Sequence, residues 1–404
     1  MWGTALASWD PEAPLHPNAE FGLQFLVAVT CSQPTIQCDG RPQCYGKSVS
    51  LLPRLPGSYL VMELANRCSL ACVHCAVADE SHPHFDATGY MDVEMAEDLF
   101  SDLAAHGISF DTLILFWLGE PLLHPEFPRI WQAAIRSAGA HGTFAKVELH
   151  SNATHLNSRF TAALLNESHI PQVLHFSLDA TDRDRYLDVK GVDRYDTVVS
   201  NIENFLTEKA RIGARWPRPV FQFIVGSNNV EQVPAFQQQW TEACASRGLP
   251  VQTVAGHVPH GEDAVVFFRQ LDCPTKEEQS AENAVFRSAM TKLDVSIPPE
   301  AVNGEVVAGD NHSVCAGFWK SPVVSWDGAV TTCTRDSHLL NQVGSLSDTP
   351  FSTLWFNESM RRRRAAVAKG DYSDLSVCQS CFIPRSLNYT GITAEEVRSW
   401  DSSP

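Results

Sequence analysis

Six short apolar runs, separated by amphipathic stretches, constrain the fold of this chain more than any other feature of its sequence. The runs are rich in Val, Ile and Phe and cover residues 59–65, 112–117, 146–150, 173–178, 220–225 and 251–255. After the first run, an apolar residue recurs every four positions from Met91 to Leu103, and Gly107 follows as a stop. Similar helical patterns cover residues 126–139, 158–168, 195–211 and 230–246. Strands that alternate with helices predict an α/β fold with a parallel sheet, either open or curled into a partial barrel.

Composition limits the classes of partner. The 404 residues are 44% hydrophobic and 19% charged, which is typical of a soluble globular protein. The first residues do not resemble a signal peptide, and we find no apolar stretch near the roughly 20 residues of a membrane span, so we expect a cytoplasmic protein without a membrane partner. A formal charge of −17 argues against nucleic acid and suits a small cationic substrate, although acidity also aids solubility.

Three of the twelve cysteines lie close together in the stretch RCSLACVHC. Cys68, Cys72 and Cys75 follow directly on the first predicted strand. In a reducing compartment, clustered cysteines bind metal more often than they form disulfides. Zinc sites usually pair two C-x2-4-C knuckles, whereas three thiolates can hold three irons of a [4Fe–4S] cube and leave the fourth iron open. His74, inside the loop, is an alternative fourth ligand.

Further polar motifs follow the second, third and fourth predicted strands. They are WLGEPLLHP, HSNATHL and FSLDATDRDRYLDVKG. The carboxyl ends of parallel strands meet at one end of a barrel, where the active site is built. The sequence therefore predicts that these motifs and the cysteine loop surround one site.

The order of these motifs resembles that of the radical S-adenosylmethionine (SAM) superfamily. Gly119-Glu120-Pro121 matches the family's GGEP motif, with Leu118 in place of its first glycine. The resemblance implies a partial (β/α)6 TIM-like barrel and a [4Fe–4S] cluster on the three cysteines. It also implies SAM bound to the open iron, which cleavage converts to methionine and a 5′-deoxyadenosyl radical.

The same resemblance implies which side chains contact SAM. These are Gly119, Glu120, Ser151, Asn152, Ser177, Asp179 and Lys190. Glu120 and the backbone around it would receive the SAM amino group, because an ammonium needs hydrogen-bond acceptors. Lys190 stands where the family more often has an arginine that pairs with the SAM carboxylate. A lysine supplies a point charge in place of a bidentate fork.

A second cysteine-bearing region contains Cys315, Cys333, Cys378 and Cys381. Between the first two, WDG is a turn signal that predicts a β-hairpin, and residues 354–370 predict a helix with a solvated arginine face. Spacing alone leaves zinc and a second iron–sulfur cluster open. The region resembles SPASM and twitch domains. Because no cysteine follows Cys381, the match is to the shorter twitch form with one auxiliary [4Fe–4S] cluster.

These patterns divide the chain into five parts. They are an N-terminal cysteine-containing extension (1–57), a core barrel (58–257), a connector (258–309), an auxiliary-cluster domain (310–392) and a tail (393–404). Cys31, Cys38 and Cys44 lie in the extension, where a third metal site stays open. Cys244, within a predicted helix, is expected to be a small packing residue.

The cysteine spacing also resembles that of aminoglycoside-pathway enzymes of the superfamily, such as 2-deoxy-scyllo-inosamine dehydrogenase. That resemblance implies oxidation of a secondary alcohol of an amino-sugar or aminocyclitol to a ketone, with the auxiliary cluster accepting an electron. An external reductant such as flavodoxin or ferredoxin would serve the first cluster. Epimerisation, with Cys273 as hydrogen donor, and maturation of a ribosomal peptide are the alternatives. Arg335, Asp336 and His338 are candidate acid–base residues by their location after Cys333.

Overall fold

The computed structural model describes residues 54–76, 87–166, 168–273, 275–298, 314–385 and 391–401. Cys31, Cys38 and Cys44 lie outside these residues, so the predicted third metal site falls outside the described part of the chain. The described strands form one sheet in the order β10-β9-β8-β1-β2-β3-β4-β5-β7-β6. The mixed α/β fold with a parallel sheet is thereby confirmed.

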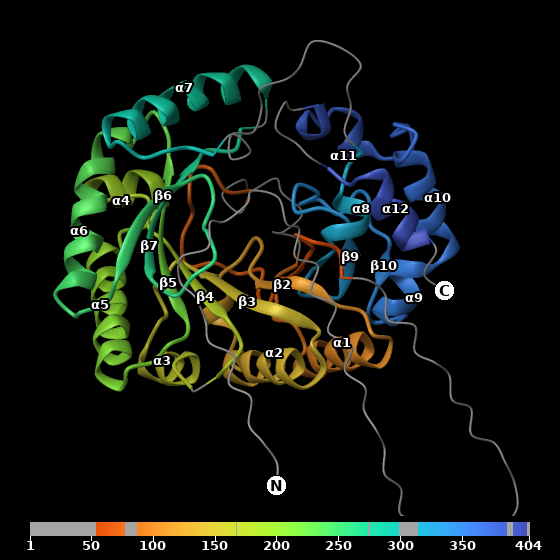
Figure 1. Cartoon of the computed structure of the whole chain (residues 1–404), viewed down its shortest axis with the longest axis horizontal. Helices are drawn as coiled ribbons and strands as arrows, with labels where there is room; N and C mark the ends of the chain where they lie inside the picture. The colour runs from red at the N-terminus through yellow and green to blue at the C-terminus, as the bar shows by residue number, and fades with distance from the viewer. Residues whose placement is uncertain are drawn as a thin grey trace, which may run out of the picture. The chain divides into compact units, whose positions relative to one another are not determined.

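Five neighbouring parallel strands coincide with the first five predicted runs. They are β1 (Tyr59–Met62), β2 (Phe110–Leu115), β3 (Phe144–Ser151), β4 (Gln172–Ser177) and β5 (Arg218–Val225). The helices that alternate with them lie along one side of the curved sheet (Figure 1). They are α1 (Val93–Ala105), α2 (Phe127–His141), α3 (Ser158–Leu164), α4 (Arg183–Lys190), α5 (Tyr195–Ile212) and α6 (Val233–Ala245).

The sixth position in the sheet differs from the prediction. The run at residues 251–255 forms β6 (Val251–Ala255), but β6 is an edge strand and does not pair with β5. A further strand, β7 (Ala264–Gln270), lies between β5 and β6 and runs parallel to both. Helix α7 (Lys276–Lys292) follows it. The segment expected to be an irregular connector therefore supplies a strand of the barrel, because AVVFFRQ is a continuous apolar run that buries well between two strands.

Side chains alternate between the two faces of the sheet, as the strand period requires. On β3, Val147 and Leu149 are buried against the helices, whereas Lys146, Glu148 and His150 are half-buried on the inner face. A small apolar cluster on the inner face contains Val173, Val220, Val265 and Phe267. The inner face is therefore apolar on one part of the barrel and carries charged groups on another.

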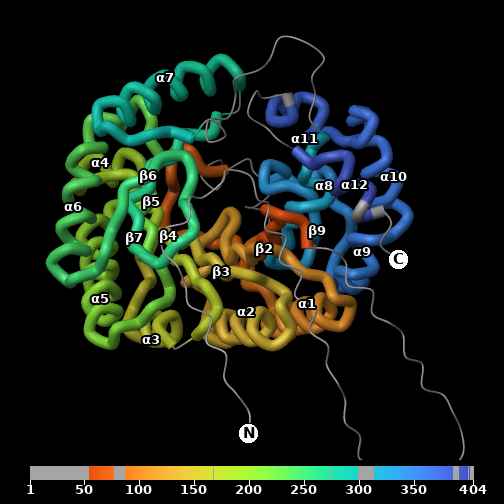
Figure 2. Tube along the Cα trace, viewed as in Figure 1, coloured from red at the N-terminus to blue at the C-terminus, as the bar shows by residue number. Residues whose placement is uncertain are grey.

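The C-terminal region continues the same sheet. The WDG turn joins β8 (Val323–Val324) to β9 (Ala329–Thr331) in an antiparallel hairpin, which confirms the predicted hairpin. Gly328 within the turn has a φ of +87°, a conformation that favours glycine. Strand β8 pairs parallel with β1, and β10 (Gly344–Ser345) pairs with β9. Figure 2 shows β9 and the rest of the C-terminal region in blue.

The predicted helix at residues 354–370 is two helices. They are α9 (Phe351–Phe356) and α10 (Glu358–Val367), separated by Asn357. Asn357 has extended backbone dihedrals, and its side chain accepts a hydrogen bond from Met360 N, so it caps the second helix. Arg364 is 4% exposed and its guanidinium lies over the Trp355 ring, so the prediction of a solvated face is wrong for this arginine.

Three short helices complete the described C-terminal region. They are α8 (Gly317–Lys320), α11 (Ser376–Gln379) and α12 (Ala394–Asp401). Cys244 is fully buried in α6, as predicted for a packing residue. None of the helices described here combines the length and the apolar composition that crossing a bilayer would require.

Candidate active site at the carboxyl ends of the strands

The loop that carries Cys68, Cys72 and Cys75 packs against the end of α4. Ala71 N donates to Lys190 O at 3.0 Å, and Val73 N donates to Val189 O at 3.0 Å. A Cβ atom on Gly191 would lie 2.4 Å from Ala71 O, so only glycine permits this approach. The three half-buried thiols are therefore held on a loop fixed by backbone contacts.

The Gly119-Glu120 segment fixes the other side of the cysteine loop. A Cβ atom on Gly119 would lie 2.0 Å from Ala65 O and 2.7 Å from Arg67 O. Glu120 N donates to Arg67 O at 2.7 Å. The predicted motif after β2 thus contacts the backbone that leads into Cys68, at a distance that excludes any side chain at position 119.

The Glu120 carboxylate joins the ends of β2 and β3. It accepts hydrogen bonds from Ser151 Oγ at 2.8 Å, from Asn152 N at 2.8 Å and from Leu122 N at 2.9 Å. Burial raises the pKa of Glu120 to about 7. Asn152 Nδ2 lies 3.6 Å from Cys68 Sγ. The structure therefore brings three predicted SAM-contact residues together beside the first cysteine, and a carboxylate that already has three donors keeps one lone-pair direction.

Asp179 and Lys190 form a buried ion pair. Lys190 Nζ lies 2.5 Å from Asp179 Oδ2, and the side chains are 2% exposed for Lys190 and 1% exposed for Asp179. Asp179 Oδ1 also accepts from Ile224 N at 2.6 Å. Burial opposes the charge on Lys190, but Asp179 and the nearby Cys72 hold its pKa above the usual range. These two side chains pair with each other, and their expected contacts with SAM stay a prediction.

Ser177 is the remaining predicted contact. It is half-buried at the end of β4 and pairs in register with Gln222 of β5. By the alternation along β4, it lies on the same face as Val173 and His175. This is the inner face of the sheet, at the end where the cysteine loop lies.

The four C-terminal cysteines form a second group of thiols. Burial raises the pKa of Cys333 and of Cys378 to about 12, and the proximity of the other thiols of this group adds to each shift. Arg335 N lies 3.4 Å from Cys333 Sγ, and Asn341 Nδ2 lies 3.4 Å from Cys378 Sγ. Half-buried thiols that repel one another as anions are suited to a cation, because a metal replaces their protons.

The distances between the thiol sulfurs distinguish a zinc site from a site for a larger iron–sulfur cluster. Tetrahedral zinc with bonds of about 2.3 Å holds its sulfurs about 3.8 Å apart. Among the described residues, one set of three metal-capable side chains has all its ligand atoms within 4.8 Å, and it is Glu148, His150 and His175, not cysteines. An iron–sulfur cube, which places one iron behind each thiolate, fits more widely separated sulfurs.

Of the candidate acid–base residues, Asp336 has a structural role. It is 1% exposed and accepts hydrogen bonds from Thr331 Oγ1, Leu340 N and Asn341 N. Its carboxylate thus stabilises the turn after Cys333. A free base would not have its oxygens occupied by three such hydrogen bonds.

Arg335 and His338 are exposed. The Arg335 guanidinium lies over the Phe382 ring at 5.2 Å, and His338 lines a hollow of about 110 Å³. Cys273 is 6% exposed, and its backbone N–H donates to Gln279 Oε1. The described contacts therefore do not bring these candidates together at one point.

Sequence reasoning missed Glu63, which links the barrel to the C-terminal region. Its carboxylate accepts from Leu118 N at 3.2 Å, from Ser325 Oγ at 3.0 Å and from Trp326 N at 3.3 Å. Burial raises the pKa of Glu63 to about 7. A lone acidic residue in the apolar run YLVMELA was the signal that could have revealed it.

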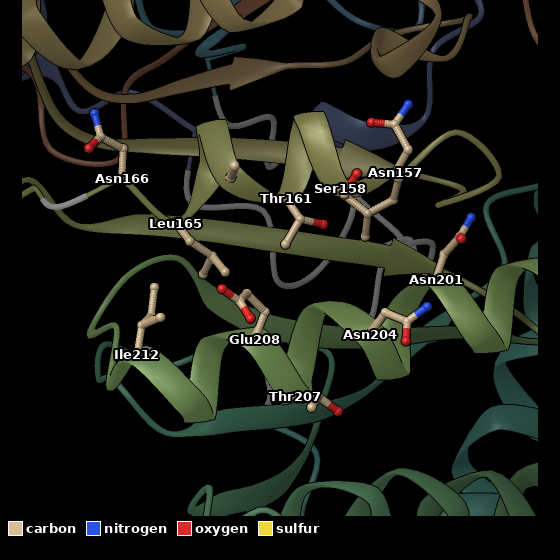
Figure 3. Close-up of a pocket in the computed structure, with 12 residues that line it drawn as sticks. Asn157, Ser158, Thr161, Leu165, Asn166, Asn201, Asn204, Thr207, Glu208 and Ile212 are labelled. Carbon is tan, nitrogen blue, oxygen red and sulfur yellow. The ribbon is translucent and has the colours of Figure 1, made fainter.

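A large hollow is lined by other residues. It measures about 760 Å³ and is lined by α3 and α5, including Asn157, Thr161, Asn204 and Glu208 (Figure 3). None of its lining residues is a predicted ligand or contact residue. We therefore assign it no part in the chemistry of the strand ends.

Two segments match known families. Residues 62–226 match the radical SAM superfamily, and residues 315–382 match SPASM, an iron–sulfur cluster-binding domain. The second match begins at Cys315 and extends one residue beyond Cys381.

Curated relatives are distant. The chain is 20% identical to a tungsten-containing aldehyde ferredoxin oxidoreductase cofactor-modifying protein of Pyrococcus furiosus, over 86% of this chain and 92% of that protein. It is 28% identical to the GTP 3′,8-cyclase of Chlorobaculum tepidum, over 37% of this chain and 41% of the cyclase. The second match thus spans less than half of either protein.

Solved structures share the fold. A polyhistidine-tagged anSMEcpe with bound AdoMet has a TM-score of 0.53 at 14% identity, over 85% of this chain and 96% of that one. Streptococcus suis SuiB bound to S-adenosylmethionine has a TM-score of 0.50 at 13% identity, over 84% of this chain and 74% of that one. At these identities the likeness concerns the fold alone.

Proposed function

The chain is a radical SAM enzyme with a SPASM domain, and on this premise we propose that it oxidises a secondary alcohol of a small cationic substrate to a ketone. The substrate class that we propose is an amino-sugar or aminocyclitol. SAM and iron–sulfur clusters are the cofactors of these two domains.

We assign the thiols to two groups, one that leaves an iron of its cluster without a protein ligand and one that does not. Cys68, Cys72 and Cys75 would hold a cluster with one free iron, and Cys315, Cys333, Cys378 and Cys381 would hold a closed auxiliary cluster. When bound, SAM and the first cluster supply the 5′-deoxyadenosyl radical that abstracts hydrogen. The chain itself fixes the first loop through Gly119 and Gly191, which bring two backbone segments into contact with it.

One observation carries the oxidation. Trp117, which follows β2 and packs with Val61 and Val323, donates from Nε1 to Thr334 O at 3.0 Å, so the residue after Cys333 contacts the inner side of the barrel strands. A closed four-thiol site next to the inner face is suited to taking an electron from a substrate there. It is less suited to binding a substrate atom, because all its positions are filled by protein.

Charge supports a cationic substrate. The formal net charge of −17 attracts cations over a long range. The inner face offers polar side chains, including Glu148, His150 and Gln222, which suit hydroxyl and amino groups.

Peptide modification is the second candidate. It is favoured by one solved structure with the same fold, anSMEcpe with bound AdoMet and Cp18Cys peptide, which has a TM-score of 0.51. Epimerisation would need an accessible hydrogen donor, and the burial of Cys273 argues against that residue.

Anaerobic reconstitution tests the proposal. We expect about eight irons per chain, the sum of two four-iron cubes, and reductant-dependent formation of 5′-deoxyadenosine. Aminoglycosides and aminocyclitols are then incubated with the enzyme in deuterated water. Loss of two hydrogens supports oxidation, and one solvent deuteron on carbon supports epimerisation. Zinc in both sites with no SAM cleavage would end the proposal.

A further inference from the structure

The inner face of β3 and β4 carries a compact group of titratable side chains outside the residues expected to contact SAM or to hold iron. Lys146, Glu148 and His150 alternate along β3, and His175 of β4 pairs in register with His150. Glu148 Oε1 lies 2.5 Å from Lys146 Nζ, and Glu148 Oε2 lies 3.4 Å from His150 Nε2. His175 Nε2 lies 3.9 Å from the same oxygen.

Two aromatic rings hold His150 between them. Its ring stacks on that of His175, with centroids 4.0 Å apart and planes at 14°. On β2's side, the Phe116 ring stacks on His150 with centroids 5.4 Å apart. The ring orientation of His150 is therefore set by neighbours and does not depend on solvent.

The charges of the group follow from its burial. Burial alone would raise the pKa of Glu148, but the hydrogen bond with His150 and the nearby His175 and Lys146 hold that pKa well below its usual range. Burial lowers the pKa of His175 well below its usual value, and His150 adds to this. Arg269 of β7 is the remaining charged group that acts on His175 from the packed strands. Because His175 is then a neutral imidazole, it is the Lys146 ammonium, 2.5 Å from Glu148 Oε1, that keeps the carboxylate ionised.

A metal ion is one occupant that such a set could take, but two features oppose it. Parallel stacked rings direct their in-plane lone pairs side by side and not toward one point, whereas a metal lies in the plane of each imidazole ligand. The Lys146 ammonium also occupies one carboxylate oxygen and repels a cation. Both features favour a proton site.

A carboxylate that accepts from one imidazole nitrogen leaves the other nitrogen as the base. Here Glu148 accepts from His150 Nε2, so Nδ1 carries the lone pair. His150 directly precedes Ser151 and Asn152, which lie beside Cys68. The base therefore lies on the inner face, one residue from the segment expected to contact SAM.

We propose that His150, held by Glu148 and stacked on His175, accepts the hydroxyl proton of the substrate. This inference rests on the proposed function and names its base. With SAM and both clusters bound, the hydrogen atom of the substrate C–H bond would go to the radical that SAM supplies, the O–H proton to His150, and one electron to the auxiliary iron–sulfur cluster. A carbon–oxygen double bond forms, so atoms and electrons balance.

The first experiment replaces the base in the reconstituted full chain. His150→Ala is expected to lower kcat by at least about 100-fold, and added imidazole is expected to restore part of the rate. KM changes less than kcat, because the contact matters most when the proton moves. His141→Gln, an exposed histidine at the end of α2, is the matched control and keeps the wild-type rate. Iron content and 5′-deoxyadenosine formation show that each variant is folded and loaded.

The second experiment measures how many protons are released when substrate binds, without turnover. Substrate binding to the SAM-loaded enzyme is measured by calorimetry in two buffers of different ionisation enthalpy. A substrate hydroxyl that donates to His150 Nδ1 takes the place of a proton there, so proton release on binding is expected in the wild type and not in His150→Ala. Glu148→Gln removes the carboxylate that accepts from His150 Nε2, so kcat is expected to fall there as well, because the imidazole loses the group that orients it.

Each outcome decides. Ketone formation at an unchanged rate in His150→Ala, or proton release that persists in it, overturns this inference and leaves the proposed function standing. A wild type that forms no ketone overturns both. Co²⁺ added to the reconstituted protein that binds at one equivalent, and is lost in His150→Ala, would identify a metal site and overturn the proton site.

Discussion

The buried pair of Lys190 and Asp179 permits a quantitative test of how the first site is held. The change is Lys190→Met, which keeps an unbranched apolar stem and removes the charge. Asp179 would then remain 1% exposed without its cation. Removing one partner of a buried ion pair costs about 3–5 kcal/mol, because the other charge is left uncompensated.

The double variant separates charge from packing. In Lys190→Met with Asp179→Asn, the asparagine oxygen can still accept from Ile224 N, and no buried charge remains. Replacing both members of such a pair is often close to neutral. We therefore expect the double variant to recover most of the loss, with a coupling free energy of about 2 kcal/mol or more.

The assay is anaerobic denaturant unfolding of the metal-free chain, with iron content after reconstitution as a second readout. Lys190 O accepts from Ala71 N and Gly191 touches Ala71 O, so a disturbed α4 end displaces the cysteine loop. The single variant should therefore also lose iron. Equal stability of the single and double variants would refute the argument that the buried charge dominates.

Three further predictions follow from other contacts. Gly119→Ala should abolish iron binding at the first site, because its Cβ would lie 2.0 Å from Ala65 O. In the control Gly139→Ala, the added Cβ would lie 3.6 Å from its nearest neighbour, so the iron content should be kept. Iron content that is unchanged in both would contradict the steric argument. Cys378→Ser should retain 5′-deoxyadenosine formation but lose ketone formation, and loss of both would argue against separate roles for the thiol groups. The Glu63 carboxyl has a pKa raised from 4.5 to about 7, so the native state binds the proton more tightly than the unfolded state does. The protonated carboxyl therefore adds to the free energy of unfolding at low pH, and this contribution is lost as the pH rises from 4.5 through 7. Melting temperatures across this range should fall less in Glu63→Gln, and an unaltered slope would refute the assignment.

The sequence predicted the elements whose pattern is local. Six strands and the WDG hairpin appear where apolar runs and turn residues indicated them. Asn357, by contrast, divides one predicted helix. An asparagine can either continue a helix or cap the start of a new one, and the local sequence does not distinguish the two. The strand β7 was missed although AVVFFRQ is a continuous apolar run, and its position between β5 and β6 is a long-range arrangement that no local pattern reports.

The site residues can also be divided into those that local motifs predicted and those that depend on long-range packing. The motif positions of Glu120, Ser151 and Asn152 converge, since the ends of parallel strands meet at one edge. The pairing of Asp179 with Lys190 could not be derived from spacing, because it depends on how α4 packs behind the loop. The cluster of Glu148, His150 and His175 depends on the register of β3 against β4, which only the structure gives.

The parallel pairing of β8 with β1 has a consequence for attempts to divide the protein. Val61 N donates to Pro322 O at 3.0 Å, and Glu63 N donates to Val324 O at 2.9 Å, a few residues before the first cysteine loop begins. Removing the C-terminal region would uncover this row of backbone donors, and an uncovered strand edge pairs with other chains. The truncated protein should therefore aggregate, and the two thiol groups are best studied by silencing one of them within the intact chain.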